Sequence, residues 1–457
     1  IQTDSQTRVD YGNLNPKIDY EKVLEFLTRT ESIMSNQLMD NIKNKAFEGY
    51  TVEWEEQVND ITKIHYLTDP VIELDFVSTD ISWNVTGSTI ISSYGRYDHS
   101  SWCSHKGIVC AWNLSIRDFN PEKATFIAES SSCVMCIEFH PIVPSLVVAG
   151  TFSGDITLWR IIENQDPVVA HSITSEFSHQ EPISQIQWIP KENSSDFNVS
   201  AYHTNSKLVS IGYEGKVIIW EIVKNFIQPI KISHLHSKLI PKLIPVTSGS
   251  SSLGLTTFTS VSQSVNDFLV GTETGFILRY SNKLAHQVTK TSKRDFTEPN
   301  PITFTFSSHI GPIQAISYSP FHRNLFLSAG SDGLVHLHHI LAPSPILSWD
   351  PSTTSITSVQ WSHSRPCVFA CTTANGNVYI YDLIVDQTAP IAEFLSTSKA
   401  GISTSSMAFN KSRNDSLAIG DVQGGISIWR LKSTLSTQNE LDQSFLDDLG
   451  SVSHIMV

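Results

Sequence analysis

The stretch LVVAGTFSGDITLWR (146–160) contains the unit that decides the fold. An apolar run ending in small residues leads to Gly154, and an alternating stretch then ends at Trp159, five positions after that glycine. A glycine and a ring residue recur at this spacing along the chain. The set is Gly107 and Trp112, Gly154 and Trp159, Gly215 and Trp220, Gly275 and Tyr280, Gly333 and His338, Gly376 and Tyr381, and Gly424 and Trp429. One such pair would mean little, but seven in phase indicate a repeat.

Short apolar runs precede these glycines, and most of those runs follow another with period-two alternation, such as VMCIEFHP (134–141). Strand, turn, strand, glycine turn and strand, repeated every 43 to 61 residues, is typical of a propeller blade. Each sheet is apolar on both faces, so the blades must stack around a closed ring. We expect the glycines in hairpins with positive φ and the ring residues wedged between blades. The sequence predicts an all-β fold, a seven-bladed β-propeller over residues 80–431.

The last blade needs an outer strand from elsewhere in the chain. The candidates are Thr62–Leu67, within a linker at 49–79, and Ser451–Val457 at the far end. The N-terminal candidate is favoured, because residues 432–457 have the composition of a polar, acidic tail. A Ser-rich, Pro-punctuated stretch from about Phe226 to Ser252 interrupts the repeat and is interpreted as a mobile insertion.

Residues 18–48 do not follow the blade pattern. The sequence IDYEKVLEFLTRTESIMSNQLMDNIKNKAF (18–47) lacks Gly and Pro, which predicts an amphipathic α-helix that ends before Gly49. Its apolar stripe consists of Tyr20, Val23, Leu24, Leu27, Met34, Leu38 and Ile42. The helix either packs on the side of the propeller or is offered to another subunit. The second interpretation is favoured, because the propeller is already a closed unit and the stripe is long.

Residues 1–17 are polar and show no periodicity, which predicts an extended segment. The segment contains two short motifs with a Gln-Thr pair, formed by Ile1, Gln2 and Thr3 and by Ser5, Gln6 and Thr7. Such a segment can bind by adding a strand to the open sheet edge of a partner.

Composition excludes several classes of protein. The 457 residues carry 31 Lys and Arg against 45 Asp and Glu, a net charge of −14, and 40% are hydrophobic, as in a globular protein with a large core. The acidic excess argues against nucleic-acid binding, and the lack of an 18-residue apolar run argues against a membrane span. Six Cys indicate no disulfide framework. No secretory signal peptide is visible in a chain that starts with Ile1 and not with Met.

Much of the acidity lies outside the repeats. Residues 1–79 hold 15 acidic and 7 basic side chains, and residues 432–457 hold 4 acidic and 1 basic. We therefore expect a nearly neutral propeller, with the flanking segments as the parts that meet protein partners.

Catalytic motifs are missing from the sequence. It contains no Gly-x4-Gly-Lys phosphate loop, no Gly-x-Ser-x-Gly elbow and no His-Glu-x-x-His zinc motif. Cys133 and Cys136 form a lone Cys-x-x-Cys, but residues three apart on a strand point to opposite faces. We expect no enzymatic activity and no cofactor, so a binding scaffold is the default interpretation.

Several histidines need an explanation of their own. The excursion SSYGRYDHSSWCSHKG (92–107) in the first blade contains His99, Cys103 and His105, which have the composition of a metal cluster. A packed or solvated loop is favoured there, because a structural zinc site needs four ligands. His179 and His309 precede strands and are expected to hydrogen-bond within their blades.

The blade pattern resembles the WD-repeat family, although the Trp-Asp dipeptide is degenerate here, as in Trp159-Arg160, Trp220-Glu221, Tyr381-Asp382 and Trp429-Arg430. Two segments narrow the resemblance. SPFHRNLFLSAGSDGLVHL (319–337) and HSSWCSHKGIVCAWNL (99–114) are similar to blades five and one of the dynein intermediate chains. The similarity is greatest to those of cytoplasmic dynein 2, the motor of retrograde intraflagellar transport.

This resemblance implies a non-catalytic subunit whose propeller binds the helical tail of the dynein heavy chain. In the family, the N-terminal extension binds dimeric light chains and pairs with a second intermediate chain. Ser5, Gln6 and Thr7 match the Gln-Thr core bound by the small strand-adding light chain, with Ser5 in place of the usual Thr. The helix lies where the family places its roadblock-type light chain. The implied locations are the cytoplasm, the cytoskeleton and the cilium.

Another class of function stays open at this point. A WD-repeat protein can also be an adaptor of a different complex, such as axonemal dynein or a ubiquitin ligase, and a few propellers are enzymes. The N-terminal extension discriminates between these alternatives, because a dynein intermediate chain should co-purify with small light chains.

Overall fold

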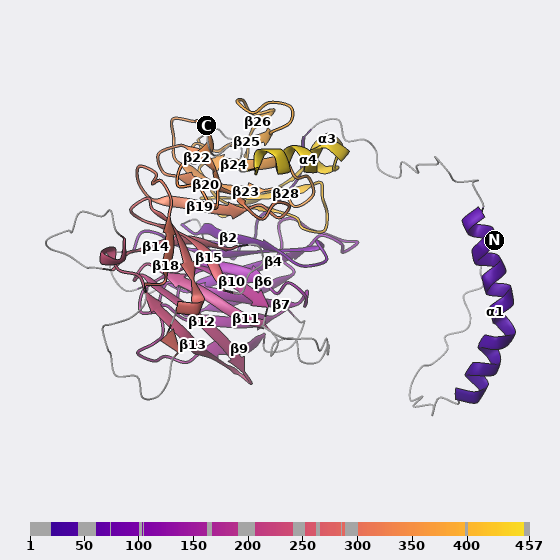
Figure 1. Ribbon diagram of the computed structural model, residues 1–457. Helices are drawn as coiled ribbons and strands as arrows, with labels where there is room; N and C mark the ends of the chain where they lie inside the picture. Colours follow the sequence, from indigo (N-terminus) through magenta and orange to yellow (C-terminus); the bar gives the residue numbers. More distant parts are fainter. Residues whose placement is uncertain are drawn as a thin grey trace. The chain divides into compact units, whose positions relative to one another are not determined.

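A computed structural model describes residues 20–43, 61–73, 75–99, 103, 105–161, 167–190, 206–240, 252–261, 266–284, 286–287, 300–397 and 401–451 (Figure 1). The chain divides into two compact units, Ile1–Gln57 and Val58–Val457. The first contains helix α1 (Tyr20–Lys43), and the second contains the sheets. Within the described ranges, no helix has both the length and the apolar character needed to cross a membrane.

The described strands of the second unit form five four-stranded antiparallel sheets and one larger sheet. In sheet order, the four-stranded sheets are β1 (Thr62–Leu67), β29 (Ile426–Arg430), β28 (Ser416–Asp421) and β27 (Thr404–Phe409); β2 (Val77–Trp83), β3 (Thr89–Gly95), β4 (Gly107–Asn113) and β5 (Phe126–Ser130); β14 (Leu255–Ser260), β15 (Asp267–Thr272), β16 (Ile277–Ser281) and β18 (Ile302–Thr305); β19 (Ile313–Tyr318), β20 (Leu325–Gly330), β21 (Val335–His339) and β22 (Pro345–Trp349); and β23 (Ile356–Trp361), β24 (Val368–Thr373), β25 (Asn377–Asp382) and β26 (Ala392–Leu395).

The larger sheet has nine strands, because two four-stranded antiparallel runs are joined at their outer strands and the short strand β17 is added to one of them. The first run is β6 (Val134–Phe139), β7 (Leu146–Thr151), β8 (Ile156–Arg160) and β9 (Val168–Ser172), and the second is β10 (Ile183–Pro190), β11 (Ser206–Gly212), β12 (Lys216–Val223) and β13 (Phe226–His234). A short parallel pairing of Phe226 with His171 and of Ile227 with Ser172 joins them. β17 (His286–Gln287) pairs with the other end of β13. These pairings cover an outer edge that would otherwise be open to strand addition.

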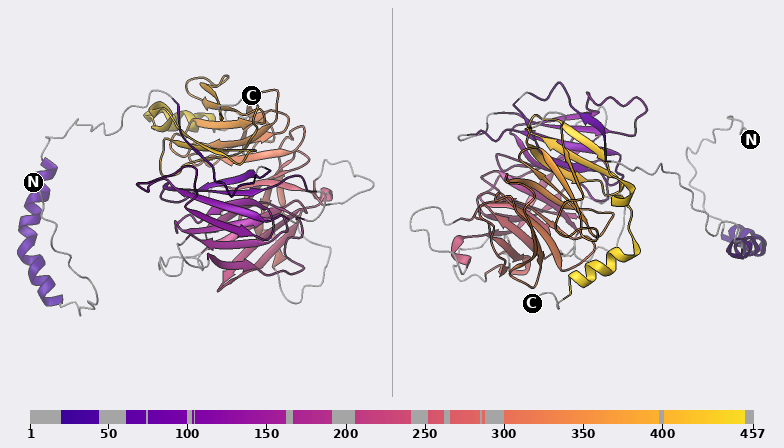
Figure 2. Two further views of the ribbon diagram at one scale, coloured as in Figure 1. Left: turned by 180° about the vertical axis from the view of Figure 1, so that it is seen from behind. Right: turned by 90° about the horizontal axis from the view of Figure 1, so that it is seen from above.

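Successive sheets pack against one another through their innermost strands, as the views in Figures 1 and 2 allow the reader to follow. β2 contacts β6, β6 contacts β10, and the series continues through β14, β19, β23 and β27 back to β2. Hydrophobic clusters fill the spaces between neighbours, and one of them combines Trp112 of β4 with Ile428 of β29 and Phe76. The sheets therefore enclose one continuous ring of cores, as the propeller prediction requires.

Ring closure uses the N-terminal candidate. β1 pairs antiparallel with β29, from Thr62 opposite Arg430 to Leu67 opposite Ile426. Leu67 is fully buried, and the Tyr66 hydroxyl donates to Asp421 Oδ2 at 2.9 Å. The prediction for Thr62–Leu67 is confirmed, while most of the alternative, Ser451–Val457, lies outside the described residues.

The repeat glycines serve two purposes. Six of them, Gly154, Gly215, Gly275, Gly333, Gly376 and Gly424, have φ between 81° and 90°, which confirms the predicted hairpin role. The expectation is wrong for Gly107, whose φ is not in the positive region. There a Cβ would contact Ser132 O and lie 2.7 Å from Val134 N, so glycine is needed for the close approach of two chain segments.

The segment after Lys432 is not only a polar tail. It contains α3 (Ser433–Ser436) and α4 (Glu440–Leu449), and Leu446 and Leu449 are buried in the cluster that holds Trp361 and Leu383. Figures 1 and 2 show the yellow α4 beside the orange strands. Its apolar residues recur at helical spacing, a pattern that the acidic composition of the segment outweighed in the sequence analysis.

The interpretation of Phe226–Ser252 as an insertion is wrong for its first part. Phe226–His234 is the outer strand β13, and Ser237–Leu239 is a 3-10 turn, η2. A second 3-10 turn, η3, follows β16 at Asn282–Leu284. Residues 241–251 lie outside the described part of the chain.

Ring closure by β1 can be tested with two truncations. Removing residues 1–57 should leave the melting temperature of the second unit unchanged, because β1 stays in place. Removing residues 1–67 should lower the melting temperature and cause aggregation. The lost burial of Leu67 alone costs about 2 kcal/mol, and β29 becomes an open edge. Calorimetry and size-exclusion chromatography measure both effects, and equal stability of the two truncated proteins would contradict closure by β1.

Candidate functional site

Helix α1 has an exposed apolar stripe. Its described members are between 44% and 69% exposed, namely Val23, Leu24, Leu27, Met34 and Leu38. The opposite face carries the polar residues Lys22, Glu25, Arg29 and Asn36, with the exposed Phe26 and Ile33 at its margin. The side chains of Tyr20 and Ile42 lie outside the described residues. So do Ile1, Gln2, Thr3, Ser5, Gln6 and Thr7, the predicted light-chain-binding segment. An apolar stripe of this length would have to be covered for the helix to be stable in water.

The ring residues of the repeat lie on the third strand of each antiparallel run. Six of them are between 0% and 2% exposed, namely Trp112, Trp159, Trp220, Tyr280, His338 and Tyr381. Trp429 is half-buried, and its ring lies 4.4 Å from that of Phe394. The hydrogen bonds of these rings show what they do in the blades.

The Trp220 ring begins a polar chain inside its blade. Its indole Nε1 donates to Ser210 Oγ at 2.7 Å, and Ser210 Oγ lies 2.7 Å from His179 Nε2. His179 Nδ1 in turn lies 2.8 Å from Glu214 Oε1, and the other carboxylate oxygen, Glu214 Oε2, pairs with Lys216. Since the indole can only donate, the serine hydroxyl donates to Nε2 and the Nδ1 hydrogen goes to the carboxylate. This confirms the expected hydrogen bonding of His179 within its blade.

The same chain recurs around His338. His338 Nε2 lies 3.0 Å from Ser328 Oγ, which lies 2.8 Å from His309 Nε2, and His309 Nδ1 lies 3.0 Å from Asp332. By the same reasoning, the His338 Nε2–H donates as the indole does. Ser, an acidic residue, Gly and the ring residue have identical spacing in both blades, at 210, 214, 215 and 220 and at 328, 332, 333 and 338. This spacing is a sequence signal that the repeat analysis missed.

Burial keeps these histidines uncharged. It lowers the pKa of His179 and of His309, and the carboxylates of Glu214 and Asp332 offset this only in part. Burial, reinforced by neighbouring histidines, lowers the pKa of His338 to about 3. Neutral His179 and His309 each accept at Nε2 and donate at Nδ1. His338 uses only Nε2, and its Nδ1 has no hydrogen-bond partner among the described residues. The other groups of these chains are engaged with one another inside the blades, which indicates a structural role.

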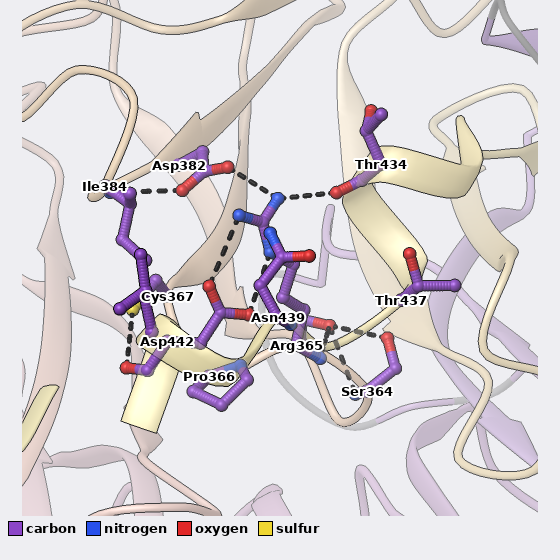
Figure 3. Close-up of polar contacts among 12 residues, drawn as sticks. Ser364, Arg365, Pro366, Cys367, Asp382, Ile384, Thr434, Thr437, Asn439 and Asp442 are labelled. Atoms are coloured by element: carbon purple, nitrogen blue, oxygen red, sulfur yellow. Dashed lines mark hydrogen bonds and ion pairs between the residues drawn. The ribbon is translucent and has the colours of Figure 1, made fainter. Parts of the chain in front are cut away.

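A buried ion cluster attaches the C-terminal helices (Figure 3). The Arg365 guanidinium lies 2.6 Å from Asp382 Oδ2 and 3.1 Å from Asp442 Oδ2, and it also donates to the Thr434 carbonyl. The three charged side chains are at most 4% exposed. Asp442 also accepts from the backbone N–H of Asn439 at 2.9 Å, which caps α4. One carboxylate therefore both starts the helix and joins it to the strands.

The loop histidines of the first blade are brought together with a cysteine from the next. His99, Cys103 and His105 lie beside Cys133, with potential ligand atoms all within 4.8 Å of one another. The sequence analysis considered Cys133 only with Cys136. Cys136 instead faces Gly150 and Ile183.

Comparisons with known proteins match this chain to dynein intermediate chains. Residues 250–431 match the family model described as the dynein axonemal intermediate chain 3 WD40 domain. The chain is 33% identical over 435 residues to cytoplasmic dynein 2 intermediate chain 2 of Mus musculus, which covers 93% of this chain and 78% of that protein. The Homo sapiens protein of that name is also 33% identical, over 95% of this chain and 80% of its own length. Dynein intermediate chain 2, ciliary, of Heliocidaris crassispina is 25% identical over 78% of this chain and 47% of its own.

The Arg365 cluster predicts a strong effect of Asp442→Asn. A buried guanidinium then loses one of its two carboxylates, and α4 loses its charged cap, so the protein should lose about 3 kcal/mol of stability. Amide hydrogen exchange should accelerate across Glu440–Leu449. Asp448→Asn makes the same change at an exposed position of α4 and should leave both quantities unchanged. If the two variants matched in exchange and stability, the cluster would not anchor the helix.

The buried His338 predicts a pH dependence. The unfolded chain takes up a proton below about pH 6.5, whereas the folded pKa is about 3, so stability present above pH 6.5 is lost as the pH falls towards 3. His338→Phe should cost about 1 kcal/mol at pH 7 through the lost hydrogen bond to Ser328. The unmodified protein should lose about 2–3 kcal/mol of unfolding free energy through His338 as the pH falls from 6.5 to 4.5, and the variant should lack this loss.

Urea denaturation between pH 4.5 and 7.5 measures both terms. The variant should be the less stable protein at pH 7 and the more stable one at pH 4.5. Phe139→Leu shortens a buried ring on β6, in another sheet, without altering the surroundings of His338, so its stability deficit should be the same at every pH. A pH profile of His338→Phe parallel to that of the unmodified protein would refute the argument.

Proposed function

The chain belongs to the WD-repeat dynein intermediate chains, and from this premise we propose that it is a non-catalytic intermediate chain of the cytoplasmic dynein 2 motor. The observation that carries the proposal is the 33% identity to cytoplasmic dynein 2 intermediate chains across 93–95% of this chain. A match over the propeller alone would have favoured a more general WD-repeat adaptor. The motor would place the chain in the cytoplasm, on the cytoskeleton and in the cilium.

We further propose that the ring consists of seven blades, with the nine-stranded sheet counted as two. Each of its two runs has four antiparallel strands, the same as the separate sheets, and only a two-residue pairing joins them. Their first strands, β6 and β10, also take successive places in the series of innermost strands.

The propeller is proposed to bind the helical tail of the dynein heavy chain. Support comes from family membership and from the closed ring, which leaves the faces and loops of the blades for contacts with a partner. No channel chemistry or mobile lid is needed for such a role. The contribution of the chain to retrograde intraflagellar transport and cilium assembly would then be mechanical, because it would hold the heavy-chain tail and a second intermediate chain together.

The N-terminal unit is proposed to bind dimeric light chains. The exposed stripe of α1 supports a roadblock-type partner, because its apolar side chains are between 44% and 69% exposed and a bound partner would bury them. The Gln-Thr motifs of residues 1–7 support the small strand-adding light chain. Two dimeric light chains would hold a second intermediate chain alongside this one. They would act by raising effective concentration, so that weak contacts give a stable assembly.

Affinity purification of the full-length protein from ciliated cells tests the proposal. It should recover a dynein 2 heavy chain, a second intermediate chain and light chains in fixed ratio. Recovery of an axonemal heavy chain or of ubiquitin-ligase subunits in their place would overturn it.

Substitution on α1 tests the helix separately. Leu27→Glu places a charge in the centre of the apolar stripe and should reduce co-purified roadblock-type light chain at least tenfold, a loss of about 1.4 kcal/mol or more. Asn36→Glu adds the same charge on the polar face and should leave recovery unchanged. The melting temperature of the propeller should be the same in both variants. Equal light-chain recovery from the two would exclude the stripe as the binding surface.

A further inference from the structure

Four side chains with metal-binding atoms meet where the first blade adjoins the second. His99, Cys103 and His105 belong to the connection from β3 to β4, and Cys133 directly precedes β6. The connections β3–β4 and β5–β6 lie at the same end of their antiparallel sheet, so both emerge on one face of the ring. Residues distant in sequence thus converge because of the blade topology.

The spacing of the ligand atoms fits a small tetrahedral ion. Zinc–sulfur and zinc–nitrogen bonds of ordinary length place the ligand atoms of a tetrahedral site about 3.3–3.8 Å apart. His99 Nε2 lies 3.0 Å from Cys103 Sγ and 3.7 Å from Cys133 Sγ. All four groups offer an atom within 4.8 Å of every other. Small side-chain rotations would bring these atoms to the distances of a bound ion.

The backbone holds this arrangement in place. The Cys133 N–H donates to Cys103 Sγ at 3.4 Å, and the Cys133 carbonyl accepts from the Phe152 N–H at 2.8 Å. The Phe152 ring stacks on His99 with 4.2 Å between ring centroids. The close approach at Gly107 brings the end of the loop against residues 132–134. Such contacts around the ligands are what orients a metal site in advance of binding.

Two ring nitrogens of the cluster are buried without compensation. His99 Nδ1 and His105 Nδ1 have no hydrogen-bond partner within the described part of the chain. A buried polar atom without a partner is costly, and native structures satisfy nearly all of them. A cation bound through Nδ1 of His105 would satisfy one of these nitrogens directly.

We propose that His99, Cys103, His105 and Cys133 bind one Zn²⁺ ion in a structural site. Two thiolates and two imidazoles in tetrahedral arrangement are the ligand set that selects zinc over harder cations such as Mg²⁺ or Ca²⁺. Four protein ligands leave no open position for water, so the ion stabilises and does not catalyse. It ties the excursion of the first blade to the first strand of the second and makes that part of the ring face a fixed surface.

Metal analysis of the full-length protein is the direct test. Protein purified without chelators should contain about one zinc per chain by elemental mass spectrometry. Replacement by Co²⁺ should give the visible bands of tetrahedral cobalt together with thiolate-to-cobalt charge-transfer bands. Cys103→Ser should lose the metal, because it removes one of the two thiolate ligands. The variant should still fold, because Cys103 is a half-buried loop residue outside the strands. Cys136→Ser, three residues from Cys133 and outside the cluster, should retain it.

Trypsin gives a second readout that does not depend on metal content. Arg96 and Lys106 flank the ligands of the loop, and the Lys106 side chain is 75% exposed. Cleavage at these sites should be slow with zinc and at least tenfold faster after chelation, and it should be fast in Cys103→Ser with or without added zinc. Zinc below a tenth of an equivalent with no uptake of added ZnCl₂ would overturn the proposal. A Cys103–Cys133 disulfide in the purified protein, or full zinc retention by Cys103→Ser, would do so as well.

Discussion

Pairing between β1 and β29 is the interaction on which the rest of the ring depends. Every blade of a propeller has two apolar faces, and each face is buried only if another blade lies against it. Opening the ring at one point would therefore expose two faces and one strand edge together. The ring is closed by β1, which precedes the first blade in sequence and pairs with the last three strands, β27, β28 and β29, in one sheet. That sheet therefore contains both ends of the ring, and Leu67 of β1 is fully buried in it.

Inside the closed ring, hydrogen-bond chains attach two of the loops that connect successive blades to the blade that follows. His179 lies in the loop before β10 and contacts Ser210 of β11, and His309 lies in the loop before β19 and contacts Ser328 of β20. Both chains use His, Ser and an acidic residue with either Trp220 or His338 as the donor. His338 occupies the position that Trp220 has in its own blade, and its Nε2 hydrogen bond replaces that of the indole. A neutral imidazole with its hydrogen on Nε2 offers the same donor, and it brings a dependence on pH that tryptophan does not have.

Periodicity predicted what depends on local chemistry. Glycines with positive φ, alternating strands and the strand at Thr62–Leu67 all follow from residue type and spacing. The pairing of β9 with β13 could not be predicted in this way, because it involves only two residue pairs and leaves no periodic pattern in the sequence. The cluster at Cys133 was missed for a related reason. Its fourth member is separated from Cys103 by the rest of a blade, and only the fold brings the two together.

Net charge is informative only after burial is known. From composition alone, the four acidic residues that follow Lys432 indicate a solvated, negatively charged tail. Asp442 is fully buried and compensates Arg365 inside the protein, so its charge is not available to attract a partner. Burial leads to a different conclusion for helix α1, because Glu21, Glu25 and Glu31 are exposed and so is the apolar stripe beside them. Lys22 and Arg29 lie on the same helix, so α1 presents its apolar stripe among charges of both signs, and the stripe is the feature of this surface that is suited to an apolar groove on a partner.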